Sequence, residues 1–315
     1  MAKYLITGVA GFIGSNIAHA LVARGEQVRG IDDLSHGRRE NLAGILDRLD
    51  FRQADITDDD AIRSACAGMD YVLHQAARGS VPRSLADPVG SNHANVVGTL
   101  KVLQAARETE VKRVVFASSS SVYGDTPTLP KREDMPCAPI SPYAISKYAG
   151  ELYAQSFARL LSLETVSLRY FNVFGPRQHP TSQYAAVIPK FIRAMLHGEQ
   201  PVIFGDGQQS RDFTFVDNVV SANLLACQAP AENVSGHVFN VAAGKRFSLS
   251  ELYSLLQELT GYSGSPSYAP SRGGDVRDSL ADNSRARQAM GYETLVDFKE
   301  GLRRTVEWYR REFCV

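Results

Sequence analysis

The N-terminal residues follow a strand–turn–helix–strand order that few folds accommodate. KYLIT (3–7) has the apolar character of a short buried strand, and SNIAHALVARG (15–25) has the apolar spacing of a helix. The turn between them, GVAGFIG, contains three glycines. Such glycines let the backbone turn tightly and approach a pyrophosphate, which the N-terminal N–H groups of the helix can bind. The residues predicted to hold a dinucleotide at this turn are Gly8, Gly11, Phe12, Ile13 and Gly14.

A second strand, QVRGIDD, ends at Asp32 and Asp33, and Asp32 lies 18 residues after Gly14. A carboxylate at this position accepts hydrogen bonds from the hydroxyls of the adenosine ribose and repels a 2′-phosphate, which favours NAD over NADP. Arg38 and Arg39 follow closely and could soften that preference. A glycine-rich turn without a ligand is the alternative, and the flanking strand, helix and acid disfavour it.

Strands and helices continue to alternate along the first half of the chain. LDFRQADIT (49–57), DYVLHQAA (70–77) and KRVVFASSSSVYG (112–124) are predicted strands, and residues 91–109 a helix. Repeated βαβ units with short connections predict an α/β fold, a doubly wound parallel sheet of the Rossmann-like class, with ligands at the carboxyl ends of its strands. Further cofactor contacts predicted at those ends are Asp55, Ile56, Gln75, Ala76 and Ala77.

The regular alternation loosens after TVSLRYFNVFGP (165–176). We therefore predict an NAD-binding domain over residues 1–172, to which residues from about 212 to 245 return. Residues 173–315 are predicted to form mainly a smaller C-terminal α/β lobe that binds substrate.

Composition excludes several other classes of function. Lys plus Arg and Asp plus Glu each number 34, so the formal net charge is zero, and neither a nucleic acid nor an anionic membrane is an expected partner. No signal-peptide core follows MAKYLITG, and no apolar stretch reaches the length that spans a bilayer, so we expect a cytoplasmic protein. The four cysteines lie far apart without metal-ligand spacing, which predicts reduced thiols and no metal site.

SPYAISKY (141–148) places a phenol, Tyr143, and an ammonium, Lys147, four residues apart just after a proline. The ordinary interpretation is an exposed pair on a surface helix. The alternative is that the cation lowers the pKa of the phenol, so that Tyr143 can transfer protons near neutral pH. The pair alone does not decide between the two.

Taken together, these motifs resemble the extended short-chain dehydrogenase/reductase superfamily and, within it, the NAD-dependent epimerase/dehydratase family. TGVAGFIGS resembles the cofactor loop of that superfamily, the serine run before VYG its catalytic serine element, and SPYAISKYAGE its YxxxK element. The resemblance covers nearly the whole chain. It implies that Tyr143 is the acid/base, that Lys147 lowers its pKa, and that Ser119 bonds the reacting sugar oxygen. Cofactor contacts implied in addition are Asn95, Tyr143, Lys147 and Phe171.

The serine run also bears on the type of reaction. Ser120 and Ser121 stand where the 4,6-dehydratases of the superfamily carry Asp and Glu, which carry out the elimination of water. Their absence is evidence against a dehydratase, and likewise against decarboxylating relatives that use an acid in this stretch.

The segments HQAARGSVPRSLADP and QYAAVIPKFIRAMLHGEQPVIFGDGQQSRDFTFVDNV resemble those of UDP-sugar C4-epimerases. The resemblance implies that Asn172 and an Arg211–Arg272 clamp bind the diphosphate, whose shape guanidinium groups match. Asp275 is expected to accept from the uridine ribose, and residues 186–188 and 202–204 to flank the uracil. The implied substrate contacts are Ser80, Val81, Ser119, Ser120, Ser121, Asn172, Ala186, Val187, Phe204, Arg211, Arg272, Asp275 and Ser279.

In these epimerases, the position aligned with Ser279 lies beside the substituent at sugar C2, where a large aromatic residue excludes an acetamido group and a small one admits it. We therefore predict NAD-dependent C4 epimerisation of UDP-GlcNAc and UDP-GalNAc, with UDP-Glc and UDP-Gal as further substrates. The alternatives are an epimerase for UDP-glucose only or for UDP-glucuronate, another nucleotide-sugar oxidoreductase or dehydratase, and a non-catalytic NAD-binding module. The resemblance also implies a homodimer, in which the helices near 91–109 and 146–162 pair across a two-fold axis.

Overall fold

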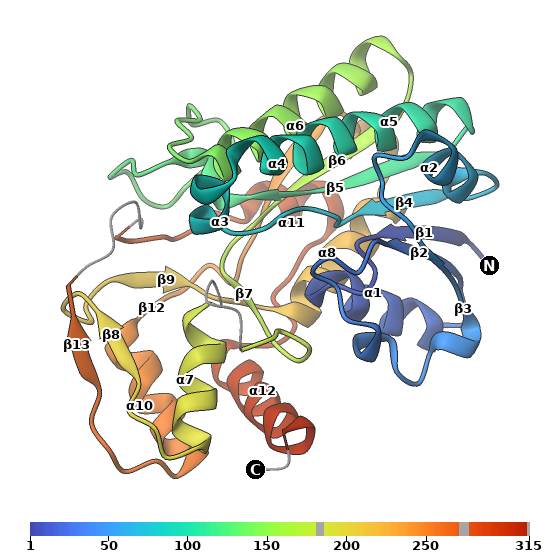
Figure 1. Cartoon of the computed structure of the whole chain (residues 1–315). Helices are drawn as coiled ribbons and strands as arrows, with labels where there is room; N and C mark the ends of the chain where they lie inside the picture. The colour runs from blue at the N-terminus through green and yellow to red at the C-terminus, as the bar shows by residue number, and fades with distance from the viewer. Residues whose placement is uncertain (181–185, 271–276, 314–315) are drawn as a thin grey trace.

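The computed structural model describes residues 1–180, 186–270 and 277–313, and its centre is a seven-stranded parallel sheet (Figure 1). The strand order is β11-β6-β5-β4-β1-β2-β3, which reverses between β1 and β4. This is the doubly wound, Rossmann-like α/β fold expected from the sequence. Its strands are β1 (Lys3–Thr7), β2 (Gln27–Asp32), β3 (Leu49–Gln53), β4 (Tyr71–His74), β5 (Arg113–Ser119), β6 (Glu164–Tyr170) and β11 (His237–Val241).

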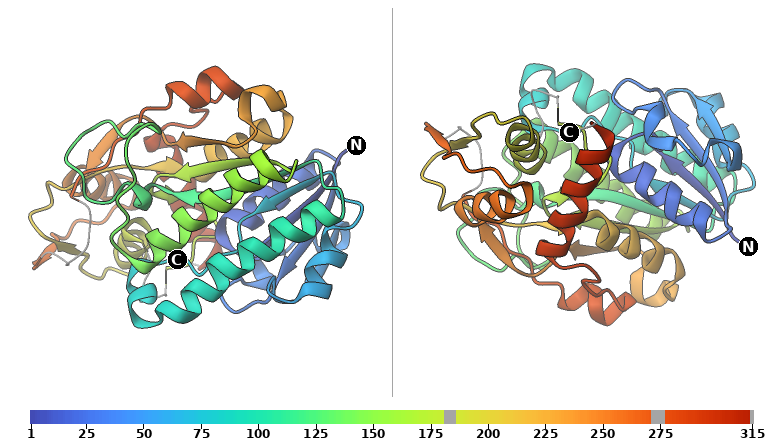
Figure 2. Two further views of the ribbon diagram at one scale, coloured as in Figure 1. Left: turned by 90° about the horizontal axis from the view of Figure 1, so that it is seen from above. Right: turned by 90° about the horizontal axis from the view of Figure 1, so that it is seen from below.

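Helices cover both faces of the sheet because its strands bury apolar side chains on both sides. In β1, Tyr4 and Ile6 join the core beneath α1 (Phe12–Ala23) and α8 (Val216–Gln228), whereas Leu5 points into the core on the opposite face. The helices on that opposite face are α2 (Asp59–Cys66), α5 (Gly98–Glu108) and α6 (Pro142–Leu160). Figure 2 (left) shows α5 and α6 side by side across it.

The helix predicted over 91–109 is longer and less regular than expected. It begins with α4 (Pro88–Asn92), passes through a π-helical turn (His93–Val97) and continues as α5. Asp87 caps α4 by accepting from the N–H of Gly90 at 2.9 Å, and proline suits the first helical position. A short helix, α3 (Val81–Ala86), precedes it.

Most of the elements that follow β6 form the C-terminal lobe. The exceptions are β11, which is a strand of the main sheet, and α8, α9 (Ala231–Val234) and α11 (Ser284–Met290), which pack on that sheet. A core rich in Phe side chains, including Phe174, Phe191, Phe213 and Phe298, fills the lobe. Its strands pair two by two: β7 (Val173–Phe174) with β10 (Thr214–Phe215), β8 (Val202–Phe204) with β13 (Ser267–Ala269), and β9 (Ser210–Asp212) with β12 (Arg246–Ser248). Its helices are α7 (Val187–Leu196), α10 (Leu249–Thr260) and α12 (Phe298–Glu312). Of the helices in the described ranges, none is long and apolar enough to cross a membrane.

Candidate active site

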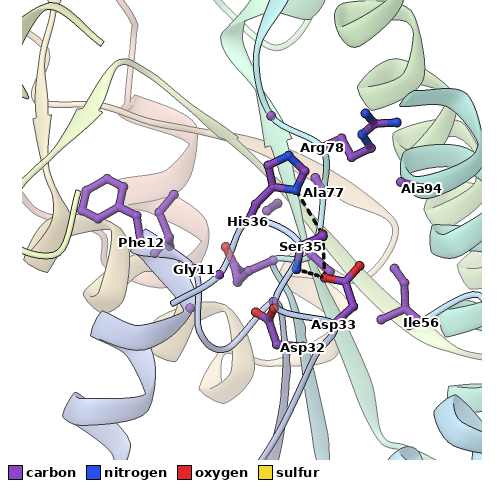
Figure 3. Close-up of a pocket in the computed structure, with 18 of the residues that line it drawn as sticks. Gly11, Phe12, Asp32, Asp33, Ser35, His36, Ile56, Ala77, Arg78 and Ala94 are labelled. Atoms are coloured by element: carbon purple, nitrogen blue, oxygen red, sulfur yellow. Dashed lines mark hydrogen bonds between the residues drawn. The ribbon is translucent and has the colours of Figure 1, made fainter. Parts of the chain in front are cut away.

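A cavity of about 710 Å³ opens at the carboxyl ends of the parallel strands (Figure 3). Among the described residues, its lining includes every predicted cofactor contact except Asn95 and Phe171. Residues as distant in sequence as Gly8 and Tyr170 line it because parallel strands bring their carboxyl ends to one edge of the sheet.

The glycine turn forms one wall of the cavity and leaves no room for side chains. Gly8 has a φ of +68°, and a Cβ there would lie 2.8 Å from the backbone N and Cα of Ala76. A Cβ on Gly14 would lie 2.9 Å from the carbonyl carbon of Gly8. The turn leads into α1, whose first helical turn contains no acidic residue and whose N-cap is Gly11. The N–H groups at this end of α1 therefore suit the pyrophosphate of a dinucleotide.

The two acids at the end of β2 lie beside this turn. Asp32 is buried, and its two carboxylate oxygens accept from the backbone N–H groups of Ala10 and Leu34, each at 2.9 Å. Burial raises the pKa of Asp32, while those N–H groups oppose the rise. Asp33 accepts from Ser35 at 2.9 Å and 2.7 Å, as Figure 3 shows. Because each carboxylate oxygen can accept more than one bond, both acids retain capacity for ribose hydroxyls.

The softening of the NAD preference by Arg38 and Arg39 stays a prediction. Arg38 is exposed and pairs with a neighbouring acid. Its guanidinium lies 3.6 Å from the carboxylate of Glu40, and its backbone N–H donates to Ala10 O at 2.9 Å.

A buried histidine behind the cavity ties three elements together and was missed from the sequence. The hydroxyl of Thr99 donates to Asn95 O at 2.6 Å, so it accepts from His74 Nε2 at 2.9 Å. His74 Nδ1 is then the acceptor for Thr7 Oγ1 at 2.7 Å. Burial, followed by the charge of Lys147, lowers the pKa of His74 to about 3. His74 is therefore a neutral tie between β1, β4 and α5.

Asn95, predicted as a cofactor contact, also lies behind the cavity. Its Oδ1 accepts from Arg78 N at 2.7 Å, and its Nδ2 donates to Ser146 Oγ at 2.9 Å. It thus connects the π-helical turn to α6 and to the backbone of Arg78, which lines the cavity.

Tyr143 and Lys147 enter the cavity from the first two turns of α6. Ser141 caps this helix by accepting from Ala144 N at 3.2 Å, and Pro142 occupies its first position. Lys147 is only 4% exposed; its Nζ donates to Ala117 O at 2.9 Å. Burial lowers the pKa of Lys147 to about 8, so the ammonium predominates at neutral pH.

The protein alone does not lower the pKa of Tyr143, and the effect of Lys147 together with bound NAD stays a prediction. Burial raises the pKa of Tyr143, and a hydrogen bond with Ser119 only opposes the rise. The physical reason is that removing a phenolate from water costs more here than the nearby donor recovers. A further positive charge at Tyr143 would be needed to bring its ionisation toward neutral pH.

The serine run brings Ser119 to the same place. Ser119 Oγ accepts from the N–H of Ser121 at 3.2 Å and from its hydroxyl at 2.9 Å, and it shares a hydrogen bond with Tyr143. The strand predicted over 112–124 ends at Ser119, and a 3₁₀ turn (Ser120–Tyr123) follows. The three predicted catalytic residues therefore meet where β5 ends.

Phe171, predicted as a cofactor contact, directly follows β6 and is not among the residues that line the cavity. Phe171 is fully buried in a small cluster with Val122, Tyr123 and Ala242. Its neighbour Tyr170 lines the cavity instead, and its hydroxyl donates to Gln75 Oε1 at 3.2 Å. Alternation along an exposed strand reveals which side chains share a face, but β6 is buried on both faces and offers no such signal.

Several predicted substrate contacts gather around β9. Asn172 has a φ of +35°, and its Nδ2 donates to Asp212 O and to Ser279 Oγ, each at 3.0 Å. Asn172 Nδ2 is thus bonded within the protein, and its contact with a diphosphate stays a prediction. Arg211 lies on β9 and donates from Nη1 to Arg277 O at 2.6 Å.

The other predicted substrate contacts lie on α7 and β8 of the lobe and on α3, which packs against α4 and α6. Val187 begins α7, Ala186 is its N-cap, and Phe204 ends β8. Ser80 caps α3, which begins at Val81. Arg272 and Asp275 lie outside the described residues.

Comparison with known proteins gives this geometry a context. The family model described as "NAD dependent epimerase/dehydratase family" matches residues 4–242. A UDP-glucose 4-epimerase of Mycolicibacterium smegmatis is 43% identical over 314 residues, which cover 98% of this chain and 99% of that protein. Two solved structures each cover 99% of both chains with a TM-score of 0.94: UDP-glucose 4-epimerase of Thermotoga maritima with UDP-glucose (39% identical), and UDP-N-acetylglucosamine 4-epimerase of Methanobrevibacter ruminantium with UDP-N-acetylmuramic acid (41% identical).

The glycine turn yields a first prediction. We expect Gly14→Ala to raise the NAD dissociation constant at least about tenfold, a loss of about 1.4 kcal/mol, because the new methyl group would displace the backbone at Gly8. Isothermal titration calorimetry measures the NAD dissociation constant of both proteins. Gly44→Ala is the control: its φ of +80° introduces strain at an exposed surface position, so it should lower thermal stability without changing NAD affinity. Unchanged NAD affinity in Gly14→Ala would show that the turn does not cradle the dinucleotide.

Proposed function

This chain belongs to the NAD-dependent epimerase/dehydratase family, and from that premise we propose that it inverts C4 of N-acetylated UDP-hexoses, with UDP-Glc and UDP-Gal as further substrates. Similarity to UDP-sugar 4-epimerases over nearly the whole chain supports the reaction. The observation that carries the proposal is the meeting of Tyr143 and Ser119 beside Lys147, in a serine run that holds no acid for water elimination.

In this proposal, residues of the chain carry out the proton transfers. Tyr143 takes the proton from the sugar 4-hydroxyl, and Ser119 bonds the same oxygen. NAD, when bound, would supply the acceptor for the C4 hydride, the donor that returns it to the opposite face of the 4-keto sugar, and a positive ring charge. After the 4-keto sugar has presented its other face, Tyr143 returns the proton to the oxygen. Lys147 stays in place throughout, since its Nζ is bonded to Ala117 O.

We further propose that the sheet domain holds NAD and the lobe holds the UDP group. The residues that line the main cavity come from the sheet domain, whereas Ala186, Val187, Phe204 and Arg211 belong to the lobe. Most of the binding energy should come from the UDP group, because a site that gripped the sugar tightly would hinder its turning.

Removing the Tyr143 hydroxyl tests the proton step. We expect Tyr143→Phe to lower turnover about 10²- to 10⁴-fold, the usual contribution of a positioned acid/base, while NAD affinity stays near the wild-type value. The assay follows UDP-GlcNAc, UDP-Glc and UDP-GlcA separately by NMR without added reductant. Wild-type turnover in Tyr143→Phe would remove Tyr143 from this role. Net formation of NADH would instead indicate an oxidoreductase.

The choice of sugar rests on Ser279. This residue is small and buried, and its hydroxyl accepts from Asn172 Nδ2 at 3.0 Å and Asp212 N at 3.3 Å. The competing interpretation is that Ser279 only makes these structural bonds and that selection at C2 lies elsewhere.

We expect Ser279→Tyr to abolish turnover of UDP-GlcNAc but to retain turnover of UDP-Glc, because a ring beside C2 blocks only the acetamido group. Ser279→Ala is the control, since it removes the hydroxyl while keeping the residue small. It should turn over both sugars. The same NMR assay measures all three proteins. Intact UDP-GlcNAc turnover in Ser279→Tyr would mean that Ser279 is not the gate.

We also propose a homodimer formed by the face that carries α5 and α6. Along α6, Ile145, Leu152, Tyr153 and Leu160 follow helical spacing and are exposed, Leu160 at 77%. Large apolar side chains gathered on one helix face are typical of an interaction surface. Figures 1 and 2 show the two helices lying together on the outside of the molecule.

Sedimentation velocity at micromolar concentration tests the dimer. We expect the wild type to sediment as a dimer and Leu152→Glu to shift it toward the monomer, because a carboxylate would lose its hydration at the interface. Glu108→Gln, on the exposed polar side of α5, should leave the dimer intact. A monomeric wild type would disprove the proposal.

A further inference from the structure

Behind the three proposed catalytic residues lies a fully buried ion pair that the reaction itself does not use. Arg169 on β6 donates from Nε to Glu151 Oε1 at 2.9 Å and from Nη2 to Oε2 at 2.7 Å. The side chains are 4% and 0% exposed, respectively. The hydroxyl of Ser118, one residue before Ser119, also donates to Glu151 Oε1.

Glu151 extends the row of side chains that enters the site from α6. It follows Tyr143 by two helical turns and Lys147 by one, so the three side chains share one face of the helix. Lys147 bonds the carbonyl of Ala117, and Glu151 bonds the hydroxyl of the next residue, Ser118. An ammonium and a carboxylate on α6 thus reach consecutive residues of β5.

Arg169 is the cation that pairs with Glu151, and the groups around the two side chains are mostly neutral or acidic. The Tyr123 ring lies 4.6 Å below the guanidinium, and Cys137 Sγ accepts from Arg169 Nη2 at 3.1 Å. Three other titratable groups face the row. His74 is neutral and lies near Lys147, and Tyr148 contacts Cys137. The third is Glu133, whose pKa is raised by burial, a rise that the charge of Arg169 opposes. Among these described groups, the only other cation is Lys147.

We propose that the Glu151–Arg169 pair is a positioning element for proton transfer: it fixes α6 against β5 and β6, and it keeps the Glu151 carboxylate from pairing with Lys147. The inference rests on the proposed roles of Tyr143 and Lys147. If Arg169 lost its charge, the cation left among the groups named above would be the Lys147 ammonium, one helical turn from Glu151 on the same face of α6. A Lys147 paired with Glu151 would favour the phenolate less, and the ionisation of Tyr143 would move to higher pH.

A purely structural pair would behave differently. Removing one partner of a buried ion pair destabilises the fold because an unpaired charge remains, whereas replacing both can be neutral. Loss of stability is therefore expected under either interpretation and does not separate them. The pH at which Tyr143 titrates separates them, because a purely structural pair would leave it unchanged.

The experiment compares Arg169→Met with Glu151→Gln and with the double variant Glu151→Gln/Arg169→Met. Tyrosinate is titrated by ultraviolet difference spectroscopy of each full-length protein against its Tyr143→Phe counterpart, with NAD present. We expect the Tyr143 titration of Arg169→Met to move to higher pH by about one unit, which is a tenfold change in ionisation. Glu151→Gln and the double variant, which lack the carboxylate, should not move in that direction.

The pH dependence of kcat/KM provides a second readout. Its limb at low pH should move upward in Arg169→Met and return in the double variant. If Arg169→Met does not fold, Arg169→Lys, a cation that lacks the guanidinium fork, should show a smaller upward shift. An unmoved titration in folded Arg169→Met, or an equal upward shift in the double variant, would overturn the proposal.

The two readouts fail for different reasons. A wild type that converts no UDP-sugar would refute the proposed function, yet the tyrosinate titration needs no substrate and would still report on the pair. An active wild type with an unmoved titration in Arg169→Met would refute the positioning role alone.

Discussion

Lys147 carries an ammonium from α6 to the carbonyl of Ala117 inside the protein, and the arrangement of the site depends on this contact. Burying a charge is unfavourable, and the pKa of Lys147 falls to about 8 as a result. The ammonium survives at neutral pH with only a small margin. Two nearby groups could change the charge or the pairing of Lys147. His74 stays neutral, and Glu151 is paired with Arg169.

The same burial explains why Tyr143 cannot be understood from sequence spacing alone. A cation four residues away predicts a lowered pKa, but the apolar surroundings raise it. In the proposed mechanism, the positive charge of bound NAD supplies the missing compensation. The phenol would then become a base only when the cofactor is in place, which confines proton removal to the complex that can also accept the hydride.

The lining of the main cavity could be predicted almost residue by residue because its signals are local. Each glycine, acid and small residue follows a strand at a fixed offset, and the parallel sheet brings those offsets together. Sequence signals are weaker where the information is tertiary. Tyr170 ends β6 and lines the cavity, whereas Phe171 follows it and is buried in a separate cluster. Glu151 and Arg169 meet only because α6 packs on β6. The substrate contacts of the lobe stay predictions, and Arg272 and Asp275 fall outside the described residues.

A buried carboxylate that could not be recognised from the sequence helps to join the lobe to the sheet. Asp212, at the end of β9, accepts from the backbone N–H groups of Ala243 at 2.9 Å and of Gly244 and Ala281 at 3.1 Å. Ala243 and Gly244 lie two and three residues after β11, an edge strand of the main sheet, whereas Ala281 lies two residues after Ser279. Asp212 therefore links the end of β11 to the segment proposed to select the sugar, beside the bond from Asn283 Nδ2 to Ala242 O at 2.8 Å. Since Arg211 precedes Asp212, a displacement of this anchor would move the proposed diphosphate contact and the proposed gate together.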